Sequence, residues 1–378
     1  MPAQAPTGSG PDRARGVEPP APATDGFGVY LHIPFCERRC DYCAFATWTD
    51  RWHLVDAYLD AVRTELERAV DAGMPPATSV FVGGGTPSAV PAEALTRVLA
   101  AVPTAPGAEV TVECNPDTVT DELVAAYVAA GVNRLSIGVQ SMVPHVLAAL
   151  GRTHGPASVE RAVATAARHG VAEVNLDLIY GAVGESLGDW AATLDAAVAL
   201  GPTHVSAYAL TVEAGTPLAA DPDRHPDDDE QADKYLLADE RLTAAGFDWY
   251  EISNWARPGS ACRHNLLTWA QGDYRGFGCA AHSHVAGRRW WNVRTPDRYV
   301  EAVVAGASPE AAGEELDAER RRLEGLQLGL RTAAGVPADA LDGQDRARFE
   351  GLVVVRGDRV VLTPAGRLLA NEVALALR

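Results

Sequence analysis

The chain has 378 residues, of which 47 % are hydrophobic, and this is enough for a sizeable core in two or three domains. Its formal net charge of −18 argues against non-specific binding to nucleic acid, which requires clustered lysine and arginine. No apolar run reaches the roughly 20 residues that a membrane span needs, which argues against an integral membrane protein. Residues 1–25 are rich in proline and alanine and lack the hydrophobic segment of a signal peptide, so we expect a disordered lead on a cytoplasmic protein.

From residue 27 to about residue 210, apolar β-branched segments alternate with segments of helical periodicity. This alternation predicts a parallel sheet with helices on its outer face. Six such units are fewer than the eight of a full barrel, so an open partial barrel and a doubly wound sheet both fit. The predicted strands are Val29–Ile33, Ser79–Val82, Glu109–Glu113, Arg134–Val139, Glu173–Ile179 and His204–Leu210. The predicted helices are Leu54–Val70, Ala92–Ala101, Asp121–Ala130, Ser158–His169 and Trp190–Leu200.

Three cysteines, Cys36, Cys40 and Cys43, lie on one short segment after the first predicted strand. Thiolates select zinc, copper(I) or iron–sulfur clusters. A structural zinc site normally takes four protein ligands, and a four-cysteine cluster needs one more cysteine than this segment provides. The other three cysteines are scattered, unlike a disulfide framework. We therefore favour an iron–sulfur cluster with one open metal position; disulfides, or zinc with a distant fourth ligand, are the alternatives.

The following strands also end in groups suited to ligand binding. The second ends in three glycines and a threonine, Gly83–Thr86, and glycine lets a backbone approach a ligand closely. The third ends at Glu113, the fourth runs into Gln140, and the fifth carries Asp177. Ligand sites of parallel sheets gather at the carboxyl ends of the strands. These residues therefore predict a ligand site on the same rim as the cysteines.

The segment Tyr30-Leu-His-Ile-Pro-Phe-Cys36-x3-Cys40-x-Tyr42-Cys43, followed by Gly83-Gly-Gly-Thr-Pro87, resembles the radical S-adenosylmethionine (SAM) superfamily. Within it, the chain is similar to the oxygen-independent coproporphyrinogen III oxidase-like group, over nearly its whole length after residue 26. The resemblance implies an α/β fold, a partial (β/α)6 radical SAM barrel, which we place at residues 26–218. A family-specific extension is expected at residues 219–310.

The resemblance also assigns roles on the rim. It implies that Cys36, Cys40 and Cys43 hold three irons of a [4Fe–4S] cluster, and that the amino and carboxylate groups of SAM chelate the fourth. Reductive cleavage then yields methionine and a 5′-deoxyadenosyl radical. The resemblance also implies that a polar set, Gln140, Arg152 and Asp177, contacts SAM or a second SAM. The positions that match SAM contacts are Tyr30, Tyr42, Gly84, Gly85, Thr86, Glu113, Gln140, Arg152 and Asp177.

Two departures separate this chain from the oxidase. The oxidase has a fourth cysteine two residues after the third, where this chain has Phe45. The oxidase also has a structured N-terminal arm, where this chain has only the short lead. Both departures resemble the HemW-type heme chaperones, which bind heme as cargo and deliver it to apoproteins, including membrane-bound respiratory enzymes. The alternative function is oxidative decarboxylation of coproporphyrinogen III.

HemW-type chains carry the motif H-N-x-x-Y-W, and here His264, Asn265 and Trp269 match it with Thr268 in place of the tyrosine. The resemblance implies that the three matching residues contact heme, since imidazole binds heme iron and an indole can pack on a porphyrin. Alternatively, His264 and Asn265 only pair backbone groups. Other candidate ligands are Cys279, His282 and His284. No anchor or basic amphipathic helix is visible, so membrane contact is expected to be transient and protein-mediated. The oligomeric state stays open.

Residues 311–378 form a separate pattern of a helix, a hairpin and a closing helix. One helix is predicted over Leu316–Leu330, and residues 336–378 then predict a further helix, a hairpin over Leu352–Val355 and Arg359–Leu362, and a closing helix from Pro364. This order resembles a small winged helix. The region is rich in acidic residues, so we expect packing or partner docking here rather than DNA binding.

Overall fold

The computed structural model describes residues 26–378, so the predicted disorder of the N-terminal lead lies outside the described residues. Six parallel strands neighbour one another in chain order, from β1 to β6. A doubly wound sheet reverses its order at a switch point, and this one does not. The structure therefore has the partial (β/α)6 barrel, and all six predicted strands are confirmed. They are β1 (Phe27–Ile33), β2 (Ala77–Gly84), β3 (Thr104–Cys114), β4 (Arg134–Gln140), β5 (Glu173–Tyr180) and β6 (His204–Ala209).

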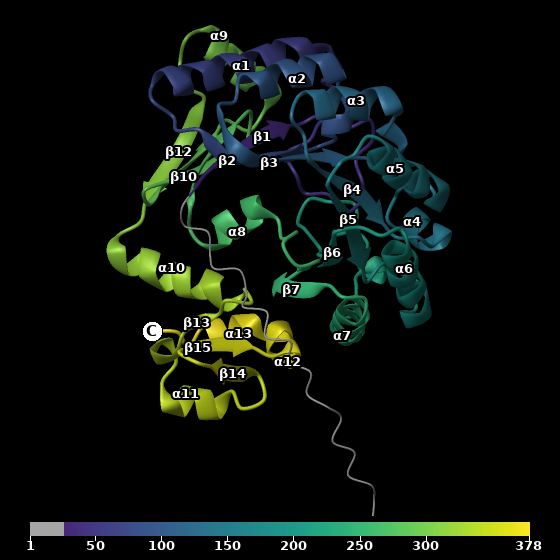
Figure 1. Ribbon diagram of the computed structural model, residues 1–378, viewed down its shortest axis with the longest axis vertical. Coiled ribbons are helices and arrows are strands. Elements are labelled where there is room, and N and C mark those ends of the chain that lie inside the picture. Colours follow the sequence, from purple (N-terminus) through teal and green to yellow (C-terminus); the bar gives the residue numbers. More distant parts are fainter. Residues whose placement is uncertain (1–25) are drawn as a thin grey trace, which may run out of the picture.

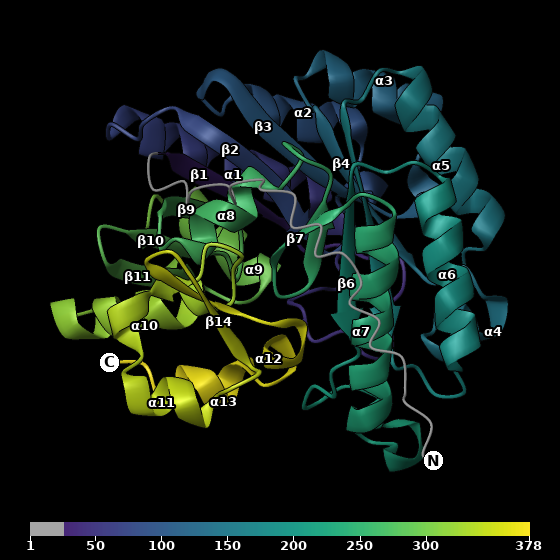
Figure 2. The same cartoon turned by 60° about the horizontal axis from the view of Figure 1, so that its bottom comes forward.

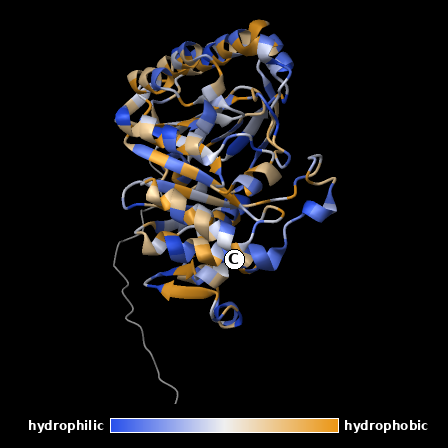
Figure 3. Cartoon of the chain, turned by 90° about the vertical axis from the view of Figure 1, so that its right-hand side faces the viewer, coloured by the Kyte–Doolittle hydropathy of each residue, from blue (hydrophilic) through white to orange (hydrophobic). Residues whose placement is uncertain are grey.

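Helices cover the outer face of these strands (Figures 1 and 2). In α1, the buried residues Tyr58, Leu59, Val62 and Leu66 fall at helical spacing and form one apolar stripe. Figure 3 shows hydrophilic and hydrophobic residues alternating along the outer helices, as expected for elements buried on one side. The five predicted helices are confirmed, and the short α4 was not predicted. With α4, the helices of the barrel are α1 (Val55–Asp71), α2 (Ala92–Ala100), α3 (Asp121–Ala129), α4 (Pro144–Ala149), α5 (Pro156–Arg168) and α6 (Leu187–Ala199).

The segment after the barrel extends the same sheet at both ends. Strand β9 pairs in parallel with β1, and β10, β11 and β12 follow it in antiparallel order. At the other end, β8 and β7 add antiparallel to β6. The added strands are β7 (Asp248–Glu251), β8 (Asn254–Ala256), β9 (Asp273–Phe277), β10 (His282–Val285), β11 (Arg288–Asn292) and β12 (Glu310–Glu315). The added helices are α7 (Asp228–Ala244), α8 (Arg263–Trp269) and α9 (Pro296–Val304).

The C-terminal unit has its own core, built around Leu330, Leu341, Val360 and Val373. Its hairpin is confirmed, but the single closing helix was wrong because the chain breaks at Leu369 into two short helices. The likeness to a winged helix stays a prediction. The elements are α10 (Ala318–Leu330), β13 (Val336–Pro337), α11 (Gly343–Arg348), β14 (Val353–Arg356), β15 (Arg359–Leu362), α12 (Pro364–Leu368) and α13 (Ala370–Ala374). Over residues 26–378, no helix is long and apolar enough to cross a membrane.

Candidate functional site

The inner face of the barrel is polar. In β1, Leu31 and Ile33 are fully buried in the core between sheet and helices, whereas Tyr30 and His32 alternate with them and point the other way. The neighbouring strands repeat this pattern, with apolar residues outside and hydrogen-bonding residues inside. The inward set comprises Ser79, Thr111, Glu113, Ser136, Asn175, Asp177, His204 and Ser206. An interior lined by polar groups is suited to hold a ligand rather than to fill a core.

The cysteine segment is fixed to the end of β2. The Gly85 amide donates to the Ile33 carbonyl at 2.7 Å, and the Thr86 amide donates to the Phe35 carbonyl at 2.8 Å. The Thr86 hydroxyl lies 3.5 Å from the sulfur of Cys36. Hydrogen bonds to cluster sulfurs influence reduction potential, so Thr86 stands where it can tune bound iron.

Gly84 shows why this strand ends in glycine. Its φ is +112°, and a Cβ there would lie 2.5 Å from the ring of His32. Any other side chain would therefore be strained and would collide with the imidazole. The close backbone approach expected of these glycines is, at Gly84, an approach to the imidazole of His32. Contact of Gly84, Gly85 and Thr86 with SAM stays a prediction.

His32 links the two ends of the cysteine segment. Its Nε2 lies 2.9 Å from the carbonyl oxygen of Ala46, and its Nδ1 lies 3.0 Å from the hydroxyl of Tyr30. A carbonyl only accepts, so Nε2 carries the proton and Tyr30 donates to Nδ1. Burial lowers the pKa of His32 to about 4, which keeps the ring neutral. His32 was not identified from the sequence, although its two-residue spacing from Tyr30 places both on one face.

Two acidic side chains face the interior beside this segment. Glu113 accepts the Gly84 amide at 3.0 Å, and burial, assisted by the charge of Asp177, raises its pKa to about 8. Asp177 accepts from the Ser136 hydroxyl at 2.7 Å and from the Asn175 amide at 2.8 Å, and burial raises its pKa also. Partly buried carboxyl groups of raised pKa favour a cationic ligand, which would restore their ionised form.

The remaining predicted contacts come from β4 and the loops around it. One guanidinium nitrogen of Arg152 lies 3.5 Å from the sulfur of Cys40, and another donates to the Gly138 carbonyl at 3.0 Å. Gln140 is buried at the end of β4 with a positive φ of 65°, next to a register shift. Tyr42 packs against a small apolar cluster that includes Leu150 and Ile179. The structure thus brings the predicted residues of five strands to one rim.

The three cysteines fit an iron–sulfur cluster by their chemistry. All are free and partly exposed on one segment, with hydroxyl and guanidinium donors beside two of the sulfurs. Among residues 26–378, no three His, Cys, Asp or Glu side chains converge closely enough to hold one metal ion. In a [4Fe–4S] cluster each cysteine thiolate binds a separate iron, so three free thiolates on one segment suit its chemistry.

The histidine of the H-N-x-x-x-W segment lies at the opposite end of the strands. His264 of α8 is buried, with Nδ1 3.1 Å from the Ser79 hydroxyl and its ring stacked on Phe81 at 5.5 Å between centroids. Burial lowers its pKa to about 4. Glu109 accepts the backbone amides of His264 and Arg263 and so fixes the start of α8. These contacts give His264 a packing role.

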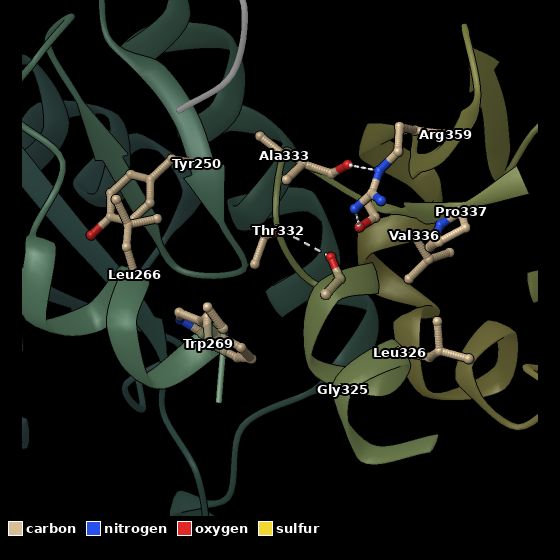
Figure 4. Close-up of a pocket in the computed structure, with 14 residues that line it drawn as sticks. Tyr250, Leu266, Trp269, Gly325, Leu326, Thr332, Ala333, Val336, Pro337 and Arg359 are labelled. Atoms are coloured by element: carbon tan, nitrogen blue, oxygen red, sulfur yellow. Dashed lines mark hydrogen bonds between the residues drawn. The ribbon is translucent and has the colours of Figure 1, made fainter. Parts of the chain in front are cut away.

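Trp269 faces a different space. It lines a cavity of about 180 Å³ between α8 and the C-terminal unit, across from Leu326 and Val336 (Figure 4). Trp269 follows His264 by five positions on the helix, which turns the two side chains about 140° apart. Asn265 is half-buried beside Tyr250. The structure therefore does not bring His264 and Trp269 together, and a cavity of this size is too small for a porphyrin.

A hydrogen-bonded chain missed by the sequence analysis connects the two ends of the interior. Asn175, which donates to Asp177, accepts from His204 at 2.6 Å, and His204 in turn accepts from the Tyr250 hydroxyl at 2.8 Å. Tyr250 lines the cavity beside Trp269. Beside it on β7, Glu251 is buried, and burial raises its pKa to about 8. No local sequence signal marks these residues, because β7 joins the barrel only through the tertiary fold.

Comparison with known proteins agrees with this geometry. The family model described as "Radical SAM superfamily" matches residues 30–197. "Heme chaperone HemW" of Mycobacterium tuberculosis (strain ATCC 25618 / H37Rv) is 46 % identical over 374 residues, covering 93 % of this chain and 94 % of that protein. The protein of that name from Escherichia coli (strain K12) is 35 % identical, covering 91 % of this chain and 96 % of its own length.

A solved structure gives the same fold. The structure titled "Coproporphyrinogen III oxidase (HemN) from Escherichia coli is a Radical SAM enzyme" superposes with a TM-score of 0.82. The match covers 93 % of this chain and 89 % of that chain at 21 % identity, so it bears on the fold alone. With the identity over nearly the whole length to the curated relatives, the chain belongs to the radical SAM superfamily and, within it, to the HemW family.

Proposed function

We propose that this chain is a heme chaperone, which binds heme as cargo alongside a SAM-ligated [4Fe–4S] cluster and delivers the heme to apoproteins. The observation that carries this proposal is Phe45, which is 65 % exposed two residues beyond Cys43, where the oxidase has a cysteine. Relatives that are 46 % and 35 % identical over most of the chain are named heme chaperones.

Different residues of the rim bind the cluster and SAM. Cys36, Cys40 and Cys43 bind three irons, and Thr86 and Arg152 donate to two of the sulfurs. When bound, the cluster and SAM together supply one-electron cleavage of the sulfonium. The positive charge of SAM is met by Glu113 and Asp177, whose carboxyl groups face the same interior.

The remaining SAM contacts are carried by Tyr30, Tyr42, Gln140 and the glycine strand. Tyr30 is held by its hydrogen bond to His32, and Gly84 is held by its amide bond to Glu113. The proposed recipients of the heme are apoproteins, including membrane-bound respiratory enzymes. The chain would contact them transiently from the cytoplasm.

The proposal and the oxidase alternative make opposite predictions in one anaerobic experiment. The cluster is reconstituted, hemin is titrated while the visible spectrum is recorded, and coproporphyrinogen III is then offered with SAM and a reductant. We expect stoichiometric heme binding and no decarboxylated product. Vinyl product, formed in the parent and lost in Cys36→Ser, would establish the decarboxylase instead.

A further inference from the structure

The Asp177 carboxylate is the end point of the hydrogen-bonded chain that crosses the barrel. Its oxygens accept from the Ser136 hydroxyl at 2.7 Å and from the Asn175 amide at 2.8 Å. The other members of the chain, Asn175, His204 and Tyr250, are buried, whereas Asp177 is partly exposed. A carboxylate has about four acceptor positions, so its oxygens can also accept from a ligand. The chain therefore leads from a buried tyrosine to the proposed SAM site.

Asn175 carries an orientation along the chain, because both ends of its amide are engaged. Its nitrogen lies 2.8 Å from Asp177 and 2.7 Å from the Ser136 hydroxyl, and an ionised carboxylate only accepts, so the donating nitrogen faces this side. Its oxygen accepts from His204 at 2.6 Å and from the Ser206 hydroxyl at 3.2 Å. An amide turned over would aim its oxygen at the carboxylate. The donors behind Asn175 therefore hold its nitrogen toward Asp177.

His204 can donate to Asn175 in only one tautomer. Burial lowers the pKa of His204 well below its usual value, so the ring is neutral and carries one N–H. Because the amide oxygen of Asn175 only accepts, that proton lies on Nδ1. Nε2 is then an acceptor, and the Tyr250 hydroxyl donates to it at 2.8 Å. The two rings also pack edge to face with centroids 5.4 Å apart, which holds this geometry.

Tyr250 connects the chain to elements outside the barrel. Burial raises the pKa of Tyr250, and hydrogen bonding from the Asn265 side chain of α8 only partly opposes this, so the hydroxyl stays protonated and can donate. The backbone carbonyl of Tyr250 accepts the Ala333 amide at 2.9 Å, from the turn between α10 and β13. Both α8 and the C-terminal unit therefore hold the residue at which the chain begins.

We infer that Tyr250 and His204 are positioning residues of the SAM site, which act through Asn175 to direct the Asp177 carboxylate toward the ligand. Successive donors along the chain point toward Asp177, and hydrogen bonds aligned in this way polarise one another in a site of low dielectric. The inference rests on the proposed binding of SAM and adds two buried residues behind its contact residues. It also gives Asn265 of the H-N-x-x-x-W segment a role through Tyr250.

A double-mutant cycle on SAM affinity tests this assignment, measured by anaerobic equilibrium dialysis with the full-length, cluster-containing chain. We expect His204→Leu to weaken SAM binding about tenfold, and Tyr250→Phe, which keeps the ring, to weaken it about threefold. In the Asp177→Asn background neither substitution should weaken binding further, because the carboxylate that they direct is gone. A merely structural defect would act equally in both backgrounds. If His204→Leu does not fold, Tyr250→Phe carries the cycle alone.

The matched control removes a hydroxyl from another buried tyrosine. Tyr299 of α9 donates to the Glu65 carboxylate of α1 at 2.6 Å, in the layer of helices outside the sheet. Tyr299→Phe thus loses a buried hydrogen bond that is not part of the chain. We expect it to leave SAM affinity at the parent value.

The outcomes separate this inference from the function on which it rests. A parent chain that binds no SAM would overturn both the inference and the SAM-binding part of the proposed function. If Asp177→Asn binds SAM as the parent does, the inference fails and the chaperone proposal stands. The inference also fails, again without touching the proposed function, if Tyr250→Phe has no effect or has the same effect with and without the Asp177 carboxylate.

Discussion

Glu113 shows how a single residue on the rim serves both the fold and the ligand. Its carboxyl group accepts the Gly84 amide, which anchors the glycine strand, and burial raises its pKa to about 8. A neutral carboxyl costs less to bury, yet a cationic ligand nearby favours the charged form. The residue is therefore poised to ionise when SAM binds.

Glu113→Gln isolates the charge, because glutamine keeps an acceptor for Gly84. We expect SAM to bind about tenfold more weakly, the loss of roughly one charge-assisted contact. Anaerobic equilibrium dialysis with the reconstituted protein measures this. The matched control is Glu93→Gln, an exposed carboxylate on α2, which should leave SAM affinity unchanged. Equal affinity in Glu113→Gln and the parent would remove Glu113 from the SAM site.

Among the helices and strands, those that a local pattern of apolar residues determines were predicted from the sequence. Strands β1 to β6 are rich in buried β-branched residues and were found, together with the rim residues at their ends. Strand β9 was missed because its pairing with β1 joins distant segments, and its residues Asp273–Phe277 alternate weakly. The position of α8, which places His264 against Ser79 and Trp269 on the cavity, was equally beyond local pattern.

The loop after β5 is held by a buried ion pair on α7. Lys234 is almost fully buried and donates to the Glu185 carbonyl at 2.9 Å, with the Glu185 carboxylate 3.4 Å away. Glu185 also accepts the Gly181 amide at 2.6 Å. The pair therefore fixes the chain that leaves the rim next to Tyr180.

Lys234→Met should destabilise the protein by about 3 kcal/mol, because it leaves the Glu185 carboxylate buried without its cation. Glu230 contacts the same lysine from the surface, at 3.6 Å, and offers a matched control. Glu230→Gln should cost at most about 1 kcal/mol. Anaerobic urea unfolding measures both, and equal small losses in the two variants would contradict this role.

The whole molecule carries buried acids and buried histidines whose ionisation opposes folding in different pH ranges. Burial raises the pKa of Glu113 and of Glu251 to about 8, whereas it lowers the pKa of His32 and of His264 to about 4. Below pH 6.5 the unfolded histidines gain protons that the folded ones do not. Above pH 6.5 the unfolded histidines lose most of those protons, whereas Glu113 and Glu251 still hold theirs in the folded state.

Between pH 6.5 and 8 the free energy of unfolding should therefore fall as pH rises. Unfolded glutamates are already ionised in this range, while Glu113 and Glu251 still hold their protons in the fold, so the unfolded state binds fewer protons. One such proton changes stability by about 1.4 kcal/mol per pH unit. Glu251→Gln should flatten the decline by about that slope. Urea titrations at both pH values measure it, and an unchanged slope would show that Glu251 is ionised throughout.

The comparison that tests the central claim most directly is the rate of heme handover. Chain loaded with heme is mixed anaerobically with the apo form of a membrane-bound respiratory cytochrome subunit, and separately with apomyoglobin, which reports passive heme dissociation. A chaperone predicts that heme reaches the respiratory subunit faster than it reaches apomyoglobin. Transfer at the passive rate to both acceptors would contradict delivery and leave only heme binding.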